Sequence, residues 1–146
     1  MYGNKTLPGI SVSQQYRDEN SIWRGYPEST WFKARKTSGF TGNLSAGTIV
    51  KENSATGVYS PITTSDIISE TANLPGVRLG IVADTTANAS ESTDVVSVDI
   101  GLHGEVDKTK LLVGDTAFTE LTETQQINLN TQLEAWGFLL VDVMQA

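Results

Sequence analysis

Two stretches of alternating apolar residues in the middle of the chain constrain its fold most. They are 77–83 and 96–102, and their apolar positions recur with a period of two: Val77, Leu79, Ile81 and Ala83, then Val96, Val98, Ile100 and Leu102. This period predicts β-strands with one face buried and the other face in water or paired. The link 84–94 has no large apolar residue, so we expect it to run over the surface.

Shorter strand and turn signals flank this pair. On the N-terminal side, 46–51 and 58–62 are extended segments separated by turn-forming residues, which predicts a hairpin. Segment 65–72 predicts a helical turn. On the C-terminal side, 103–107 predicts a corner around a glycine, and 108–113 is compatible with either a helical turn or a strand.

The clearest helix signal follows near the C-terminal end. Thr122 and Gln125 have the spacing of a capping box, in which each side chain bonds the other residue's backbone N–H. Gly137 is well placed to end the helix. The residues at helical spacing that should face the core are Leu129, Leu133 and Trp136. Segment 138–143 then predicts a last, mostly buried strand.

These signals predict a mainly β protein with short helices, of the α+β class. The chain has 146 residues, enough for one domain with a real core. It has no cysteine, which excludes disulfides and thiolate chemistry. The longest purely aliphatic or aromatic run, 138–141, is too short to span a membrane, and the first residues lack the apolar segment of a signal peptide. We expect a protein made in the cytoplasm.

The charge is distributed unevenly along the chain. Residues 1–40 carry six basic and three acidic groups, a net charge of 6 − 3 = +3, whereas residues 41–146 carry four basic and fourteen acidic groups, a net charge of 4 − 14 = −10. A body with this charge repels phosphate, which argues against nucleic-acid binding. A basic segment on an acidic body suggests an arm that docks on an acidic surface.

The same first quarter of the chain holds most of the aromatic residues. Seven of the eleven lie within residues 1–40, without a periodic pattern that would give them a local core. We therefore predict an extended N-terminal arm (1–40) and a β-rich domain (41–146). Two interpretations of the arm stay open: it folds back on its own domain, or it becomes ordered on a neighbouring molecule, with its aromatic side chains as anchors.

Acidic residues around the single histidine are the only candidates for chemistry. They are Asp99, His103, Glu105 and Asp107. Carboxylates can act as an acid–base pair or bind a hard cation, but one histidine without cysteine does not make a zinc or iron site. We expect these residues to form a solvated edge, and we expect no catalytic residue, metal or cofactor. An enzyme or ion-binding domain that uses them remains the less favoured alternative.

Several of these segments, taken in order, resemble one protein family. The segments are Ala46-Gly47-Thr48-Ile49-Val50 with its hairpin, Leu79-Gly80-Ile81-Val82-Ala83-Asp84, and Val98-Asp99-Ile100-Gly101-Leu102-His103-Gly104-Glu105-Val106. They are followed by the short segment ending near Leu112 and by a helix that ends at Gly137 before an apolar strand. Together they resemble the lambda-like head decoration proteins of tailed bacteriophages, also called capsid cement proteins, over about residues 40–146.

This resemblance implies a β-tulip-like domain and a structural role in the virion. Proteins of this family are similar in binding the expanded phage head as homotrimers, at three-fold and quasi-three-fold positions. There they stabilise the major capsid protein against the pressure of packaged DNA, on the outer surface of the capsid. The partners implied are the major capsid protein and further copies of the chain, with no direct contact to nucleic acid or membrane.

The arm is where we expect capsid contacts. The candidate residues are its aromatic and basic side chains: Trp23, Arg24, Tyr26, Trp31, Phe32, Lys33, Arg35 and Lys36. Besides the enzyme alternative, a second rival is a module that binds glycans or the host surface.

Overall fold

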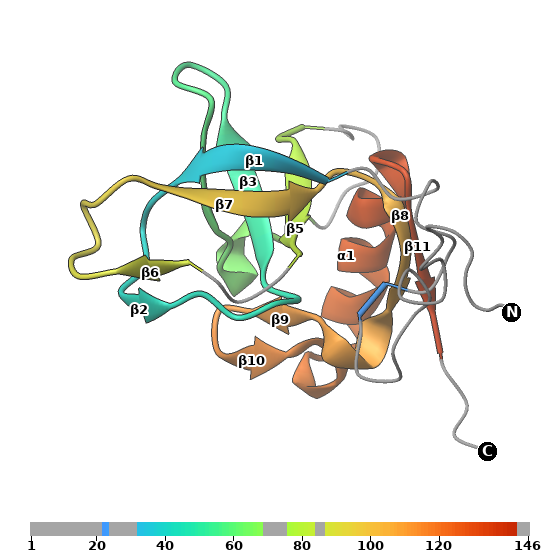
Figure 1. The fold of residues 1–146 in the computed structure, drawn as a ribbon. Coiled ribbons are helices and arrows are strands. Elements are labelled where there is room, and N and C mark those ends of the chain that lie inside the picture. Colours follow the sequence, from blue (N-terminus) through green and yellow to red (C-terminus); the bar gives the residue numbers. More distant parts are fainter. Residues whose placement is uncertain (1–21, 24–31, 69–75, 84–86, 143–146) are drawn as a thin grey trace, which may run out of the picture.

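The computed structural model describes residues 22–23, 32–68, 76–83 and 87–142 (Figure 1). It is mainly β with one α-helix, as the sequence predicts. Its strands are β1 (Phe32–Thr37), β2 (Gly42–Asn43), β3 (Ile49–Asn53), β4 (Val58–Pro61), β5 (Leu79–Val82), β6 (Asn88–Ala89), β7 (Val96–Gly101), β8 (Gly104–Asp107), β9 (Leu112–Val113), β10 (Thr116–Ala117) and β11 (Phe138–Val141). Within the described ranges the helices are α1 (Glu123–Ala135) and the short 3-10 helices η3 (Thr64–Asp66), η5 (Lys108–Lys110) and η6 (Phe118–Glu120).

Five strands close into a barrel, in the order β1-β4-β3-β5-β7. The two predicted central strands are β5 and β7, which pair antiparallel with Ile81 opposite Gly101. The predicted hairpin is β3 and β4, also antiparallel. Side chains from these strands and the adjoining loops form one buried cluster, here called the barrel cluster: Phe40, Leu44, Val50, Tyr59, Val82, Ala87, Ala89, Val98, Ile100 and Leu102.

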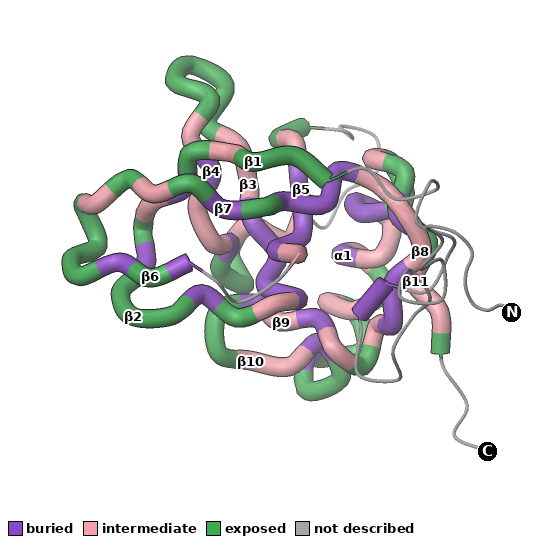
Figure 2. Tube along the Cα trace, in the orientation of Figure 1, coloured by how far each residue is buried: buried purple, intermediate pink, exposed green. Residues whose placement is uncertain are grey.

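Strand β5 is buried on both faces, which the alternating pattern did not predict. All four of its residues are buried (Figure 2). Val82 belongs to the barrel cluster, whereas Leu79 and Ile81 belong to a second cluster outside the barrel. At Gly80 an added Cβ would meet the Ile100 side chain, so the pairing with β7 requires a residue without one. Strand β5 is therefore shared by two layers.

Part of the segment predicted to be the N-terminal arm (1–40) is a strand of the barrel. The arm prediction included 32–40, but Phe32–Thr37 form β1, which pairs antiparallel with β7 over six consecutive residue pairs. Strand β1 is mostly exposed, and Lys33 and Lys36 break the alternation that marks a half-buried strand (Figure 2). Backbone pairing, which closes the barrel and leaves β7 no free edge, places this segment instead.

The second layer combines α1 with the parallel pair β8 and β11. The helix begins as predicted: the Thr122 hydroxyl accepts a hydrogen bond from the Gln125 N–H at 3.1 Å, and the Gln125 side chain accepts one from the Thr122 N–H at 3.1 Å. Leu129 and Leu133 are fully buried, and Gly137 ends the helix with φ at +94°. The second buried cluster, here called the helix cluster, is Ile22, Trp23, Ile49, Ile62, Leu79, Ile81, Val106, Leu111, Val113, Phe118, Leu121, Leu129, Leu133 and Phe138.

Three local predictions change in detail. The corner predicted at 103–107 is mainly strand β8, because it pairs with β11. The last strand is only half buried, since Phe138 lies in the helix cluster but Leu139 is 51% exposed. The link predicted to run over the surface is exposed at 90–93, but its β6 pairs with β2, and Ala87 and Ala89 join the barrel cluster.

Two further segments combine or shorten the predicted elements. Segment 108–113, for which a helical turn and a strand were both possible, contains one of each, η5 followed by β9. The helical turn predicted at 65–72 is η3 at its start, and its part beyond Ile68 lies outside the described residues. No helix in the described ranges is long and apolar enough to cross a membrane.

We predict that Leu133→Ala lowers the free energy of unfolding by about 2–5 kcal/mol, because it leaves a cavity in the helix cluster. Leu139→Ala is the matched control: it removes the same atoms from an exposed position, and we expect it to cost less than about 1 kcal/mol. Chemical denaturation of both variants measures the difference. Equal effects of the two changes would show that this face of α1 is not part of the core.

Candidate functional site

The residues predicted to contact the capsid separate into three groups. Trp23 and Arg35 are turned toward the protein's own interior, and Phe32, Lys33 and Lys36 are exposed on β1. The remaining predicted residues, Arg24, Tyr26 and Trp31, lie outside the described residues.

Trp23 packs within the domain of its own chain. It is buried in the helix cluster and forms an antiparallel bridge with Val106 of β8. Its indole lies on the backbone of Gly101, where an added Cβ would overlap the ring. Phe32 packs edge-on against it, with ring centroids 5.0 Å apart. For Trp23, the interpretation as an anchor on a neighbouring molecule is therefore replaced by the alternative in which the segment folds back on its own domain.

Arg35 is likewise directed toward the barrel. Its side chain is half-buried, and Nε has no hydrogen-bond partner among the described residues. Burial raises the pKa of Tyr59 and Glu52 raises it further, whereas the charges of Arg78 and Arg35 act in the opposite direction. Arg78 in turn donates to the Leu102 carbonyl. The positive charges of both arginines thus act on a buried tyrosine of the barrel cluster.

Arg78 also links the barrel to the helix layer. Its guanidinium carbon lies 4.9 Å from the centre of the Trp136 ring, at the C-terminal end of α1. A cation over the face of a tryptophan is attracted by the negative charge of the ring face. Arg78 therefore has partners in both layers, and this end of the barrel is held by contacts within the protein.

The acidic residues near His103 differ in their exposure and contacts, and they do not form a metal-binding group within the described residues. Asp99 is exposed on β7, whereas Asp107 is buried at the end of β8 and accepts hydrogen bonds from the Thr109 N–H at 3.0 Å and the Thr109 hydroxyl at 2.6 Å. Glu105 is half-buried on β8. Within the described ranges, no group of three or more histidine, aspartate or glutamate residues could hold a metal ion.

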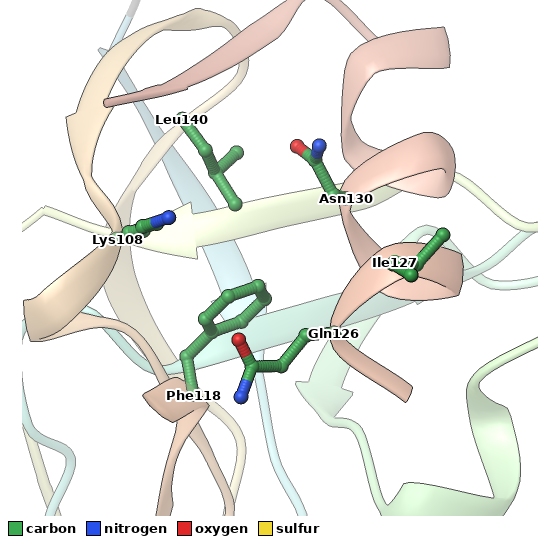
Figure 3. Close-up of a pocket in the computed structure, with 6 residues that line it drawn as sticks. All are labelled: Lys108, Phe118, Gln126, Ile127, Asn130 and Leu140. Carbon is green, nitrogen blue, oxygen red and sulfur yellow. The ribbon is translucent and has the colours of Figure 1, made fainter. Parts of the chain in front are cut away.

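The structure also has a groove between α1 and β11, which the sequence did not predict. Figure 3 shows the six residues that line it, from four different elements: Lys108, Phe118, Gln126, Ile127, Asn130 and Leu140. Its volume is about 170 Å³. The signal that could have revealed it is Ile127, an isoleucine on α1 that does not share the face of Leu129 and Leu133 and is 58% exposed.

Comparisons with known protein families, with curated proteins and with solved structures gave no match.

We predict that Gly101→Ala and Trp23→Ala are coupled in their effect on stability. The first forces a methyl group into the indole and should cost about 1–3 kcal/mol, and the second should cost about 3–5 kcal/mol. In the double variant the methyl group has room, so the total should fall below the sum by at least about 0.5 kcal/mol.

Gly57→Ala provides the matched control for this cycle. Gly57 lies in the β3–β4 turn with φ at +74° and open space around an added Cβ, so the change strains the backbone without touching Trp23. Its cost should add to that of Trp23→Ala. Additive costs for Gly101→Ala as well, measured by denaturation, would show that the indole does not lie on Gly101.

Proposed function

We propose that the protein is a capsid decoration protein that binds the expanded head of a tailed bacteriophage as a homotrimer. The observation that carries the proposal is the arrangement of the segments that resemble this family. Segment 46–50 leads into β3, 79–84 covers β5, and 98–106 covers the end of β7 and most of β8. The predicted helix and last strand are α1 and β11. Residues from these segments lie in the barrel cluster or in the helix cluster, and strand β5 contributes residues to both.

A body of this kind suits a structural role at symmetric positions. A protein that binds the expanded lattice and not its precursor stabilises the expanded state by mass action. A trimer that contacts several subunits at once needs only modest affinity at each contact, because the later contacts form within one complex. We further propose that this β-rich body has a β-tulip-like fold and lies on the outer surface of the virion.

The exposed side of β1 is the part of the proposed capsid contact that the structure describes. Phe32 is 44% exposed, and Lys33 and Lys36 are exposed on the same strand. They retain part of the positive charge of the first forty residues, on a body whose residues 41–146 carry −10. This contrast favours a partner surface with acidic groups opposite β1 and a neutral or basic surface elsewhere.

We predict that the double change Lys33→Glu and Lys36→Glu weakens binding to undecorated expanded heads by about tenfold at low salt, because each exposed ion pair contributes up to about 1 kcal/mol. The loss should shrink as salt is added, since exposed charges are screened. Co-sedimentation of the full-length chain with heads of the phage that encodes it measures binding, and sedimentation equilibrium measures the trimer.

The control variant adds negative charge at the tip of the β3–β4 hairpin, with Ser54→Glu and Thr56→Glu. Both residues are exposed, so this variant should bind as the wild type does. Wild-type protein that fails to sediment with expanded heads would refute the proposed function. Unchanged binding of the lysine variant would refute only the contact through β1.

A further inference from the structure

Strand β1 places an arginine on the inner face of the barrel. Arg35 is directly opposite Val98 in the antiparallel pairing of β1 with β7, and Val98 is a buried member of the barrel cluster. Residues directly opposite each other in such a pair have their side chains on the same face of the sheet. Arg35 therefore points to the side that otherwise holds apolar side chains, where a charged group needs a partner.

A second arginine lies at one end of the barrel. Arg78 immediately precedes β5, and its carbonyl accepts a hydrogen bond from the N–H of Glu52, near the end of β3, at 2.9 Å. Its guanidinium donates to the carbonyl of Leu102, the residue that follows β7. The start of β5 and the ends of β3 and β7 thus meet at Arg78.

The charges of both arginines act on Tyr59, which is 2% exposed in the barrel cluster. Burial raises the pKa of Tyr59 and Glu52 raises it further, whereas the charges of Arg78 and Arg35 and a hydrogen bond from Arg78 lower it. The two guanidinium groups therefore belong to one electrostatic group with the tyrosine hydroxyl, although they come from different strands.

Contacts among the described residues do not neutralise this positive charge. No ion pair between described residues includes Arg35 or Arg78, and Nε of Arg35 is buried without a hydrogen-bond partner among them. Glu52 is opposite Tyr59 in the β3–β4 pair and so on the same face, but it forms no ion pair with either arginine. A buried N–H donor without an acceptor is unfavourable, so this end of the barrel calls for a negatively charged acceptor.

Lys33 adds to the positive charge on the inner face of β1. It is exposed, two residues before Arg35, and lies opposite Ile100. Together with Arg35, Arg78 and Glu52 it gives three basic groups and one acidic group, a net charge of 3 − 1 = +2. A local positive group of this kind attracts a small anion even on a protein whose net charge is −7.

The donors at this end of the barrel suit a tetrahedral oxyanion. A guanidinium presents N–H donors in a fixed fork that bonds two oxygens of a phosphate or carboxylate, and a tyrosine hydroxyl can donate to another oxygen. Both arginines are half-buried, so a small ion can reach them from solvent. The mouths of β-barrels are common positions for small ligands.

We propose that this end of the barrel binds a small oxyanion of the phosphate type, held by the guanidinium groups of Arg35 and Arg78 and the hydroxyl of Tyr59. The net charge of the group favours a dianion over a monocarboxylate. The anion supplies the acceptor that Nε of Arg35 lacks, so its binding also stabilises the barrel. The inference does not depend on the proposed capsid role.

Titration of the full-length chain with inorganic phosphate at constant ionic strength tests the site. We expect phosphate at about 20 mM to raise the midpoint of thermal unfolding by at least about 2 °C relative to sodium chloride, because the anion binds the folded state. Sodium acetate should give less than about half of this shift, since it carries one charge. In NMR spectra the Nε–H signal of Arg35 should shift with phosphate and reach saturation.

Substitutions should change the phosphate affinity in opposite directions. Arg35→Gln removes one fork and one charge, and we expect it to weaken binding at least about tenfold. Glu52→Gln removes the repelling carboxylate and should tighten binding at least about threefold. A residue with only a structural role would not produce a gain of affinity of this kind.

Lys51→Gln is the matched control. Lys51 is opposite Leu79 of the helix cluster, on the outer face of the barrel, and forms an ion pair with Asp66 at 2.8 Å. Removing this charge should leave the phosphate affinity within about twofold of the wild type, because it is on the other face and screened by solvent. Thermal unfolding without phosphate checks that each variant folds.

The outcomes decide between binding and a purely structural role for the arginines. Equal stabilisation of the wild type by phosphate and by sodium chloride, or unchanged phosphate affinity in Arg35→Gln, would overturn the site. If Arg35→Gln does not fold, an affinity that fails to rise in Glu52→Gln would overturn it instead. Acetate that stabilises as strongly as phosphate would overturn the assignment to a phosphate-type anion. None of these measurements involves capsids, so their failure leaves the proposed function untouched.

Discussion

The contact between the Trp23 indole and the backbone of Gly101 connects the two halves of the protein. Gly101 pairs with Phe32 of β1 and Ile81 of β5, so the ring covers the place where three barrel strands meet. The same tryptophan bridges Val106 of β8. A large aromatic surface buried at such a junction stabilises both sides at once. The other links between the barrel and the helix layer are Ile49 of β3, Leu79 and Ile81 of β5, and the contact of Arg78 with Trp136.

Glycine at two barrel positions allows this double layering. Gly80 and Gly101 lie on neighbouring strands, and a side chain at either would meet Ile100 or Trp23. A side chain at Gly101 would push the Trp23 ring away from β7, and one at Gly80 would enter the barrel beside Ile100, so close packing on the two sides of the barrel wall depends on both glycines. The alternating pattern in the sequence therefore marks the strands correctly but does not show that the small residues between the apolar ones are also covered.

The elements that sequence predicts well are those whose signals are local. The capping box at Thr122 and Gln125, the helix stop at Gly137 and the β3–β4 hairpin each depend on residues close together in the chain. Strand β1 and Trp23 were misassigned because their partners, β7 and Gly101, are distant in sequence. The groove between α1 and β11 was missed for the same reason, since Phe118, Ile127 and Leu140 converge only after α1 packs beside β11.

The barrel can close only after most of its strands have been synthesised. Strand β1 leaves the ribosome early, but its antiparallel neighbour β7 follows only after β3, β4 and β5 have been made. Until then the backbone edge of β1 and the ring of Trp23 have no surface to cover them, and contacts between distant segments form slowly. The nascent chain therefore passes through a period in which β1 and Trp23 are open to contact with other chains.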